Sequence, residues 1–283
     1  MNTAILLISC PDQKGITAKI TNFVYENNGN IEHADQHIDF ETNTFLMRIE
    51  WSLAGFRVPK KNIAAQFSQL ASEFAMNWSL HFSEETPRVA LFVSRAAHCL
   101  YDILLRHQEG QLPCAIPLII SNHTQPRAIA DLFGIKFYHS PKTATNKRAR
   151  EKKEIELLQK ENIEQLVLAR YMQIFTGRFV RLFPNRIINI HHSFLPAFAG
   201  RAPYRQAYLR GVKIIGATSH FVTEDLDTGP IIGQQTVGIS HRNTLDDLKR
   251  KGKDLEKIVL GRAVRFYLER KILVYGNKTV IFD

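Results

Sequence analysis

The first 85 residues alternate two kinds of apolar pattern. Some stretches are short apolar runs or alternate apolar with polar residues, which predicts strands, and others repeat apolar residues at helical spacing. The predicted strands are 4–8, 31–40, 45–51 and 78–82. The predicted helices are 12–27, which Asn28-Gly29 ends, and 59–74. The resulting order of strand, helix, strand, strand, helix and strand predicts a ferredoxin-like βαββαβ domain over residues 1–85.

Thr86-Pro87 interrupts this pattern, and a regular alternation of strands and helices follows. The predicted strands are 89–93, 115–121, 136–138, 166–169, 187–190, 214–223 and 231–237. The predicted helices are 98–107, 126–133, one that ends near 161, and 244–268. Residues 272–275 and 279–282 predict a closing hairpin across Gly276-Asn277. Such alternation is typical of an α/β fold, so we expect a Rossmann-like second domain over residues 86–283 with a mostly parallel sheet.

The net charge of +10 is divided unequally between the two predicted domains. Residues 1–85 hold 6 Lys and Arg against 10 Asp and Glu, a balance of −4, so the other 31 basic and 17 acidic residues give residues 86–283 a balance of +14. This balance favours an anionic partner, either a nucleic acid or an anionic metabolite. The densest basic run, 147–153, is interleaved with acidic residues, which is typical of a solvated helix face. No aromatic RNA-binding pattern or helix-turn-helix signature accompanies it, so we expect no nucleic-acid partner.

The cysteines and the apolar stretches indicate where the protein works. Cys10, Cys99 and Cys114 are odd in number and form no CxxC pair, so we expect neither a disulfide framework nor a structural zinc site. The longest apolar stretches, such as 115–120, are too short to span a bilayer, and the first residues lack the basic segment of a signal peptide. These features favour a reducing cytoplasm and no membrane partner.

The segment 189–196, Asn-Ile-His-His-Ser-Phe-Leu-Pro, carries the first candidate chemistry. Asn189 and His191 lie two positions apart on a predicted strand, so their side chains point to one face. At the carboxyl end of a parallel strand, that face opens into the ligand crevice. The amide can donate to a developing oxyanion, and the imidazole can shuttle a proton. Taken alone, the pair still favours a packed or hydrogen-bonded histidine.

The segment 216–230 changes this interpretation. A predicted strand delivers His220, a loop presents carboxylates that include Asp227, and Gly229-Pro230 turns the chain into the next strand. A carboxylate in such a loop can orient a water, accept its proton or raise the basicity of a neighbouring His. Four histidines lie in this part of the chain, at positions 191, 192, 220 and 241. Because there is no HExxH motif or cysteine set beside them, we expect no metal.

Together the two segments resemble the folate-dependent formyltransferase family, whose mark is N-x-H-x-S-x-L-P followed by a loop ending in L-D-x-G-P. The family's catalytic residues fall on Asn189, His191 and Asp227, with His220 and Ser193 in support. Residues 168–175 resemble the family's folate-binding loop. The resemblance spans 86–283 and implies 10-formyltetrahydrofolate as the substrate and no tightly bound cofactor. The implied folate contacts are Tyr171, Met172, Gln173, Ile174, Phe175 and Val222. The chain departs from the family pattern at 200–203, where the basic residue is expected one place later.

The first domain resembles an ACT domain, the ferredoxin-like module that senses amino acids. The matching residues are 10–16, Cys-Pro-Asp-Gln-Lys-Gly-Ile, and 29–31, Gly-Asn-Ile, after the first helix. The resemblance implies a homo-oligomer and an amino-acid effector, glycine or methionine, near Asp12, Gly15 and Asn30. A domain that serves only as a dimerisation scaffold is the alternative.

The acceptor of the formyl group follows from residues outside the catalytic set. A sister family that formylates glycinamide ribonucleotide holds its phosphate with a glycine-rich turn after the first strand, whereas residues 94–98 here read Ser-Arg-Ala-Ala-His. The order of the two modules is similar to that of the formyltetrahydrofolate deformylase family along the whole chain. This resemblance implies hydrolysis to formate and tetrahydrofolate, which would supply formate for purine synthesis and balance the one-carbon folate pools. Phosphoribosylglycinamide formyltransferase-type transfer and a non-catalytic folate sensor remain as alternatives.

Overall fold

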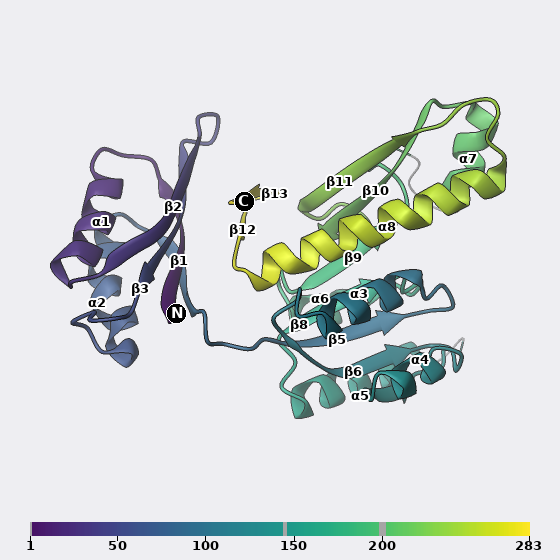
Figure 1. Cartoon of the computed structure of the whole chain (residues 1–283), viewed down its shortest axis with the longest axis horizontal. Coiled ribbons are helices and arrows are strands. Elements are labelled where there is room, and N and C mark those ends of the chain that lie inside the picture. The colour runs from purple at the N-terminus through teal and green to yellow at the C-terminus, as the bar shows by residue number, and fades with distance from the viewer. Residues whose placement is uncertain (1, 144–145, 198–201) are drawn as a thin grey trace. The chain divides into compact units, whose positions relative to one another are not determined.

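The structure is a computed structural model that describes residues 2–143, 146–197 and 202–283. Its contacts divide the chain into two compact units (Figure 1). The first unit contains the chain up to Glu85 together with Arg270–Tyr275 and Thr279–Asp283. The second contains Thr86–Glu269 and Gly276–Lys278. In the described residues, no helix combines the length and the apolar composition that are needed to cross a membrane.

The first unit contains a four-stranded antiparallel sheet in the order β2-β3-β1-β4. Its elements are β1 (Thr3–Pro11), α1 (Ile16–Glu26), β2 (Asn30–Asp39), β3 (Thr44–Ser52), α2 (Lys60–Glu73) and β4 (Asn77–Phe82). Ile20 of α1 and Phe67 of α2 are fully buried in one core with alternate residues of the strands, including Trp51. The predicted βαββαβ order is confirmed.

A C-terminal hairpin completes this unit on the opposite face of its sheet. The hairpin consists of β12 (Ile272–Tyr275) and β13 (Lys278–Ile281). Leu273 and Phe282 form a small buried cluster with Leu46, whose side chain points away from the main core because it alternates with its neighbours on β3. The sequence pattern predicted the hairpin but assigned it to the second domain. The division differs because both faces of β3 are apolar and the hairpin covers the second one.

The second unit is built on a seven-stranded sheet in the order β11-β10-β9-β8-β5-β6-β7. The strands are β5 (Arg88–Val93), β6 (Ala115–Ser121), β7 (Lys136–His139), β8 (Gln165–Ala169), β9 (Ile187–His191), β10 (Ile214–Phe221) and β11 (Ile231–Gly238). The five strands from β9 to β7 are parallel, and β10 and β11 run antiparallel to their neighbours. The predicted α/β fold with a mostly parallel sheet is confirmed.

Helices cover both faces of this sheet (Figure 1). They are α3 (His98–Gln108), α4 (Arg127–Leu132), α5 (Lys147–Lys160), α6 (Gly177–Arg181), α7 (Pro203–Arg210) and α8 (Leu245–Leu268). Leu158 of α5 and Phe179 of α6 share a core with Phe92 of β5, whereas α8 packs against β9, β10, β11 and α3. The short helices α6 and α7 were not predicted, since neither is long enough to show a periodic apolar pattern.

The order of the strands creates a topological switch point. From β5 the chain builds β6 and β7 on one side, then returns across β5 to build β8 and β9 on the other. Connections therefore leave the carboxyl ends of β5 and β8 in opposite directions, which opens a crevice between them. The turn after β5, the loop after β8 and the end of β9 meet at this edge of the sheet.

Candidate active site

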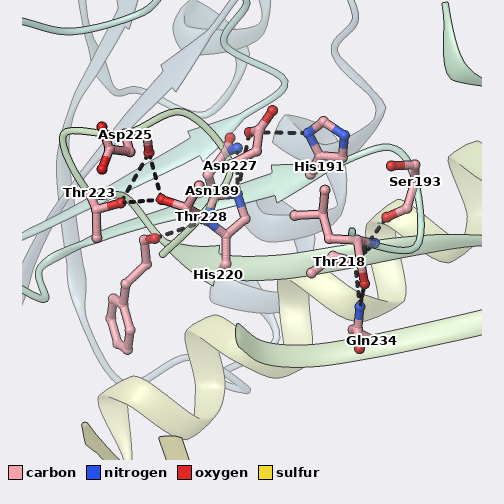
Figure 2. A network of polar contacts seen from close by, with 12 residues as sticks. Asn189, His191, Ser193, Thr218, His220, Thr223, Asp225, Asp227, Thr228 and Gln234 are labelled. Carbon is pink, nitrogen blue, oxygen red and sulfur yellow. Dashed lines mark hydrogen bonds and ion pairs between the residues drawn. The ribbon is translucent and has the colours of Figure 1, made fainter. Parts of the chain in front are cut away.

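The pairing of β9 with β10 brings the sequence-predicted polar residues onto one face. Asn189 and His191 lie two positions apart on β9, and the antiparallel register places His220 opposite Asn189 and Thr218 opposite His191. His191 and His220 are buried, and Asn189 is half-buried. Figure 2 shows these side chains around Asp227, which comes from the loop after β10. The structure therefore brings together the predicted catalytic residues and His220.

Asp227 lies close to both histidines. Its Oδ1 lies 3.2 Å from Nδ1 of His191 and 3.7 Å from Nε2 of His220. Burial would raise the pKa of the Asp227 carboxyl, but its interactions with the histidines, chiefly the hydrogen bond from His191, outweigh it, and the pKa lies below its usual value. The backbone at Asp227 has a φ of +57°, a left-handed conformation that aspartate tolerates better than most residues.

The contacts of His220 define its protonation. Nδ1 lies 2.9 Å from the carbonyl oxygen of Phe221, which only accepts, so Nδ1 carries the hydrogen. Burial lowers the pKa of His220 and favours the neutral ring, in which Nε2 is an acceptor. Nδ2 of Asn189 lies 3.2 Å from this Nε2 and donates to it. His220 thus orients the Asn189 amide and leaves its second N–H hydrogen free for another acceptor.

The contact with Asp227 also orients the ring of His191. Because the carboxylate accepts, Nδ1 of His191 donates, and Nε2 is the ring nitrogen that Asp227 does not engage. This Nε2 is buried and has no hydrogen-bond partner among the described residues. It is therefore the atom of His191 that is available to take up a proton and to release it.

A threonine supports the chain directly after β9. Thr218 Oγ1 donates to the carbonyl oxygen of Ser193 at 2.9 Å and accepts from the backbone N–H of Leu195 at 3.0 Å. Gln234 of β11 donates to the same hydroxyl at 3.0 Å. The Ser193 hydroxyl itself is buried with no partner among the described residues. Thr218 thus holds the backbone of Ser193, and the supporting role of the Ser193 side chain stays a prediction.

The loop after β8 contains five of the residues that the sequence assigned to folate, and Val222 follows β10. Tyr171 and Phe175 are buried in one apolar cluster, and Val222 packs against it. Gln173 is half-buried, whereas Met172 and Ile174 are 58% and 59% exposed. The loop therefore joins a fixed aromatic base to two apolar side chains that are open to a ligand.

Two side chains fix the ends of this loop. At its start, Ser94 Oγ accepts from the backbone N–H of Met172 at 2.9 Å and donates to Asn122 at 2.7 Å. At its end, the Glu151 carboxylate accepts from the backbone N–H of Thr176 at 2.9 Å and from the Thr176 hydroxyl at 2.5 Å. The loop is thus tied to the turn after β5 and to α5.

The basic run 147–153 is only partly a solvated face. Lys152 and Lys153 are exposed, but Arg150 is buried beside Glu154, with Arg150 Nε 3.4 Å from Glu154 Oε1. Burial raises the pKa of Glu154 above its usual value. The prediction of a solvated face was therefore wrong for Arg150, Glu151 and Glu154, because residues three and four apart on α5 lie on its buried side.

A second buried polar group lies near the predicted catalytic residues, and we call it the Glu256 cluster (Glu256, His98, Arg170 and Tyr204). His98 Nε2 donates to Glu256 Oε2 at 2.6 Å, and the Tyr204 hydroxyl donates to Oε1 at 2.5 Å. Arg170 Nε lies 3.3 Å from the same Oε2. Burial would raise the pKa of Glu256, but the hydrogen bond from His98 and the charge of Arg170 lower it, so the carboxyl is ionised.

His98, Cys99 and Glu256 also offer three possible metal-ligating atoms within 4.8 Å of one another. Their chemistry does not fit a resident cation. Burial, followed by the charge of Glu256, raises the pKa of the Cys99 thiol, so it stays protonated. Arg170 already neutralises the carboxylate oxygen that a cation would use.

Comparisons with known proteins assign both parts of the chain to known families. A family model described as formyl transferase matches residues 87–264, and an ACT domain model matches residues 4–71. The chain belongs to the formyl transferase family. A formyltetrahydrofolate deformylase from Synechocystis sp. is 56% identical over 280 residues, which are 99% of this chain and 98% of that protein. The crystal structure of a formyltetrahydrofolate deformylase from Pseudomonas syringae pv. tomato has a TM-score of 0.98 at 43% identity, covering 100% of this chain and 95% of that one.

The formyl transferase family also includes relatives of another kind. A glycinamide ribonucleotide transformylase from Symbiobacterium toebii has a TM-score of 0.68 at 33% identity. It covers 72% of this chain and 98% of that chain, so more than a quarter of this chain has no counterpart there. Similarity over the full length therefore separates the deformylases from the transformylases.

The residues assigned to an amino-acid effector do not meet within one chain. Asp12 and Gly15 follow β1 at the end of the sheet where Pro11 pairs with Thr44. Asn30 begins β2 at the opposite end, where it pairs with Ser52. The eight residue steps of β3 from Thr44 to Ser52 correspond to about 26 Å. A site that uses all three residues would need two copies of the chain.

Sequence reasoning missed the carboxylates that hold the site together. Glu256 lies in a helix far along the chain, and its apolar neighbours give no sign that it points inward with them. Glu151 lies among lysines, and only its spacing to the apolar residues of α5 could have indicated burial. The departure from the family pattern at Gly200-Arg201 lies outside the described residues.

Proposed function

We propose that the protein hydrolyses 10-formyltetrahydrofolate to formate and tetrahydrofolate. The proposal is carried by one observation: the deformylase similarity extends over both modules, whereas the transformylase similarity leaves more than a quarter of the chain unmatched. The pair of His191 and Asp227 beside the Asn189 amide supports it, since these groups supply a proton carrier and an oxyanion donor.

The proposed reaction moves one formyl group to water. Asp227 orients the water and, with His191, takes up its proton as the oxygen attacks the formyl carbon. The free N–H hydrogen of Asn189 donates to the oxyanion of the tetrahedral intermediate. The bond between the formyl carbon and N10 then breaks, and His191 Nε2 gives its proton to N10. These steps move protons and the formyl group without any change of oxidation state, so they call for no tightly bound cofactor.

The direct test is formate release from 10-formyltetrahydrofolate by the purified protein with no acceptor added. Asn189→Ala is the matched variant, because loss of one oxyanion donor typically lowers the rate on the order of a hundredfold or more. His220 keeps its bond to Phe221 in this variant, so the fold should persist. Near-normal turnover by Asn189→Ala would contradict the role that we propose for the amide.

Transfer of the formyl group to an amine is the second candidate, and the similarity to the transformylase from Symbiobacterium toebii favours it over a non-catalytic sensor. Tetrahydrofolate formation that requires glycinamide ribonucleotide, together with formylation of that compound, would support transfer. If the chain bound tetrahydrofolate but did not consume 10-formyltetrahydrofolate, the result would support a non-catalytic folate sensor.

We also propose that the ACT domain binds an amino acid, glycine or methionine, between two copies of the chain. The separation of Asp12 and Gly15 from Asn30 supports a site that two copies share, and hence a homo-oligomer. Each amino acid is titrated against formate release, with the Asn30→Ala variant beside the wild type. If no amino acid changed the rate of formate release, the alternative would hold, in which the ACT domain serves only as a dimerisation scaffold.

The positive charge of the second unit has a proposed use in capturing the substrate. Folates carry anionic glutamyl tails, and a balance of +14 over residues 86–283 would steer them. The exposed Lys152 and Lys153 are available for such contacts. A kcat/KM that responds to salt equally for short and long tails would contradict this proposal. We place the chemistry in a reducing cytoplasm, because all three cysteines are free and buried.

A further inference from the structure

The crevice at the switch point between β5 and β8 is where an open α/β sheet ordinarily receives a ligand. Arg170 follows β8 directly, and His98 begins α3 after the turn that leaves β5. Both side chains reach across this edge of the sheet to Glu256 of α8. A second organic substrate that entered the crevice would therefore meet the Glu256 cluster.

The side chains of the Glu256 cluster are largely inaccessible to solvent. The Glu256 side chain is 1% exposed, and those of His98 and Arg170 are 16% and 15% exposed. The Tyr204 ring packs on α8 at Gly252, one turn before Glu256. A Cβ at position 252 would collide with this ring. The glycine thus permits the close approach that brings the Tyr204 hydroxyl to the carboxylate.

The backbone of Arg170 indicates that its side chain has a specific use. Its φ of +64° lies in the left-handed region, where glycine is relaxed and a bulky residue is rare. Arginine at this position supplies the guanidinium that balances Glu256. Such an outlier in a crevice points to a role in function rather than in folding.

A neutral histidine connects this cluster to the catalytic residues. The ring of His192 lies 6.0 Å from that of Tyr204 and 5.2 Å from that of His191. Burial, followed by the charge of Arg170, lowers the pKa of His192 to about 3, so its ring stays uncharged. The Glu256 cluster therefore lies next to the place where an acceptor would approach the formyl group.

We propose that the Glu256 cluster closes the switch-point crevice to organic amines and thereby leaves water as the acceptor. The inference rests on the proposed hydrolysis. An amine that entered would have to displace Arg170 or His98 from Glu256, and an uncompensated charge in the interior is strongly unfavourable. Arg170, Glu256 and His98 are thus residues that determine specificity, and they need not touch the reacting atoms.

The test measures formate release from 10-formyltetrahydrofolate while the concentration of glycinamide ribonucleotide is raised. The variant is Arg170→Gly/Glu256→Gln. Glycine suits the left-handed backbone, and glutamine keeps an acceptor for Tyr204 while removing the charge that arginine balanced. Asp246→Asn/Lys249→Gln is the matched control, because it removes an exposed ion pair from the same helix.

The wild type and the control should release formate at a rate that the amine does not change. In Arg170→Gly/Glu256→Gln the rate should fall on the order of tenfold, because a bound amine competes with water at high effective concentration. Where the amine reacts, its nitrogen bonds to the formyl carbon, the bond to N10 breaks, and the proton of the amine passes to N10. A folded variant whose formate release ignores the amine would overturn the inference, and so would a wild type that the amine slows.

Two further measurements separate the possible failures. If the wild type releases no formate at all, the proposed function fails, and calorimetric titration of glycinamide ribonucleotide into wild type and variant still tests the closure. Binding to the variant alone supports it, and equal binding or none contradicts it. If the double variant does not fold, His98→Ala opens the crevice from the turn and leaves Arg170 opposite Glu256, and the same titration applies.

Discussion

Among the substitutions considered, we expect loss of the charged contact between Asp227 and His191 to lower the catalytic rate most. Asp227→Asn removes the negative charge and keeps the size of the side chain, and asparagine tolerates the φ of +57° as well as aspartate does. Unit charges 3.2 Å apart attract each other by about 5 kcal/mol at an effective dielectric constant of about 20. That energy is an upper limit, because the Asp227 side chain is 13% exposed, and it corresponds to nearly four orders of magnitude in rate. We therefore expect kcat to fall by about a hundredfold to ten-thousandfold.

The assay is single-turnover formate release with wild type and Asp227→Asn, each at saturating 10-formyltetrahydrofolate. Equal melting temperatures and equal affinity for tetrahydrofolate would show that fold and folate site persist. The loss should appear in kcat, since His191 acts in the chemical step. If Asp227→Asn retained more than about a tenth of the wild-type kcat, the charge on Asp227 would not support His191 as we reason.

Three further predictions concern stability. Thr244 accepts from the Asp247 backbone N–H at the start of α8, so Thr244→Ala should lower the free energy of unfolding by about 1 kcal/mol, measured by urea denaturation, with kcat/KM unchanged. The pKa of His192 falls to about 3 on folding, so its stabilising effect is complete above the ordinary value of about 6.5 and is lost as the pH falls toward 3. Between pH 7.5 and 5.5 this loss is about 1.4 kcal/mol, and His192→Gln should show a correspondingly smaller drop across that range. Phe282 is buried against Leu46, so Phe282→Ala should destabilise the first unit by about 3–5 kcal/mol, and a change below about 1 kcal/mol would contradict the assignment of the hairpin to that unit.

Local apolar patterns predicted most of the fold because each element buries a face whose period is visible in its own residues. The long helix α8 shows this, with apolar residues at helical spacing and a Thr244 cap. The hairpin of β12 and β13 was predicted as a hairpin but was assigned to the other domain. Its pattern shows that one face is apolar and does not show which sheet covers that face.

The candidate site divides in the same way. Asn189, His191 and Asp227 could be found because a strand fixes the first two on one face and a recognisable loop carries the third. The tautomer of His220 could not be predicted, since it depends on the carbonyl of Phe221, whose direction only the folded backbone sets. The burial and pairing of Glu256 could not be predicted for a related reason, because its partners come from three distant segments.

The central claim is that water accepts the formyl group, and the isotope content of the product tests it most directly. The protein is supplied with 10-formyltetrahydrofolate in ¹⁸O-labelled water, with and without glycinamide ribonucleotide, and the formate is analysed by mass spectrometry. Hydrolysis predicts one ¹⁸O atom in each formate and a yield equal to the tetrahydrofolate formed, whether or not the amine is present. Tetrahydrofolate formed without labelled formate, or only when glycinamide ribonucleotide is added, would contradict the account.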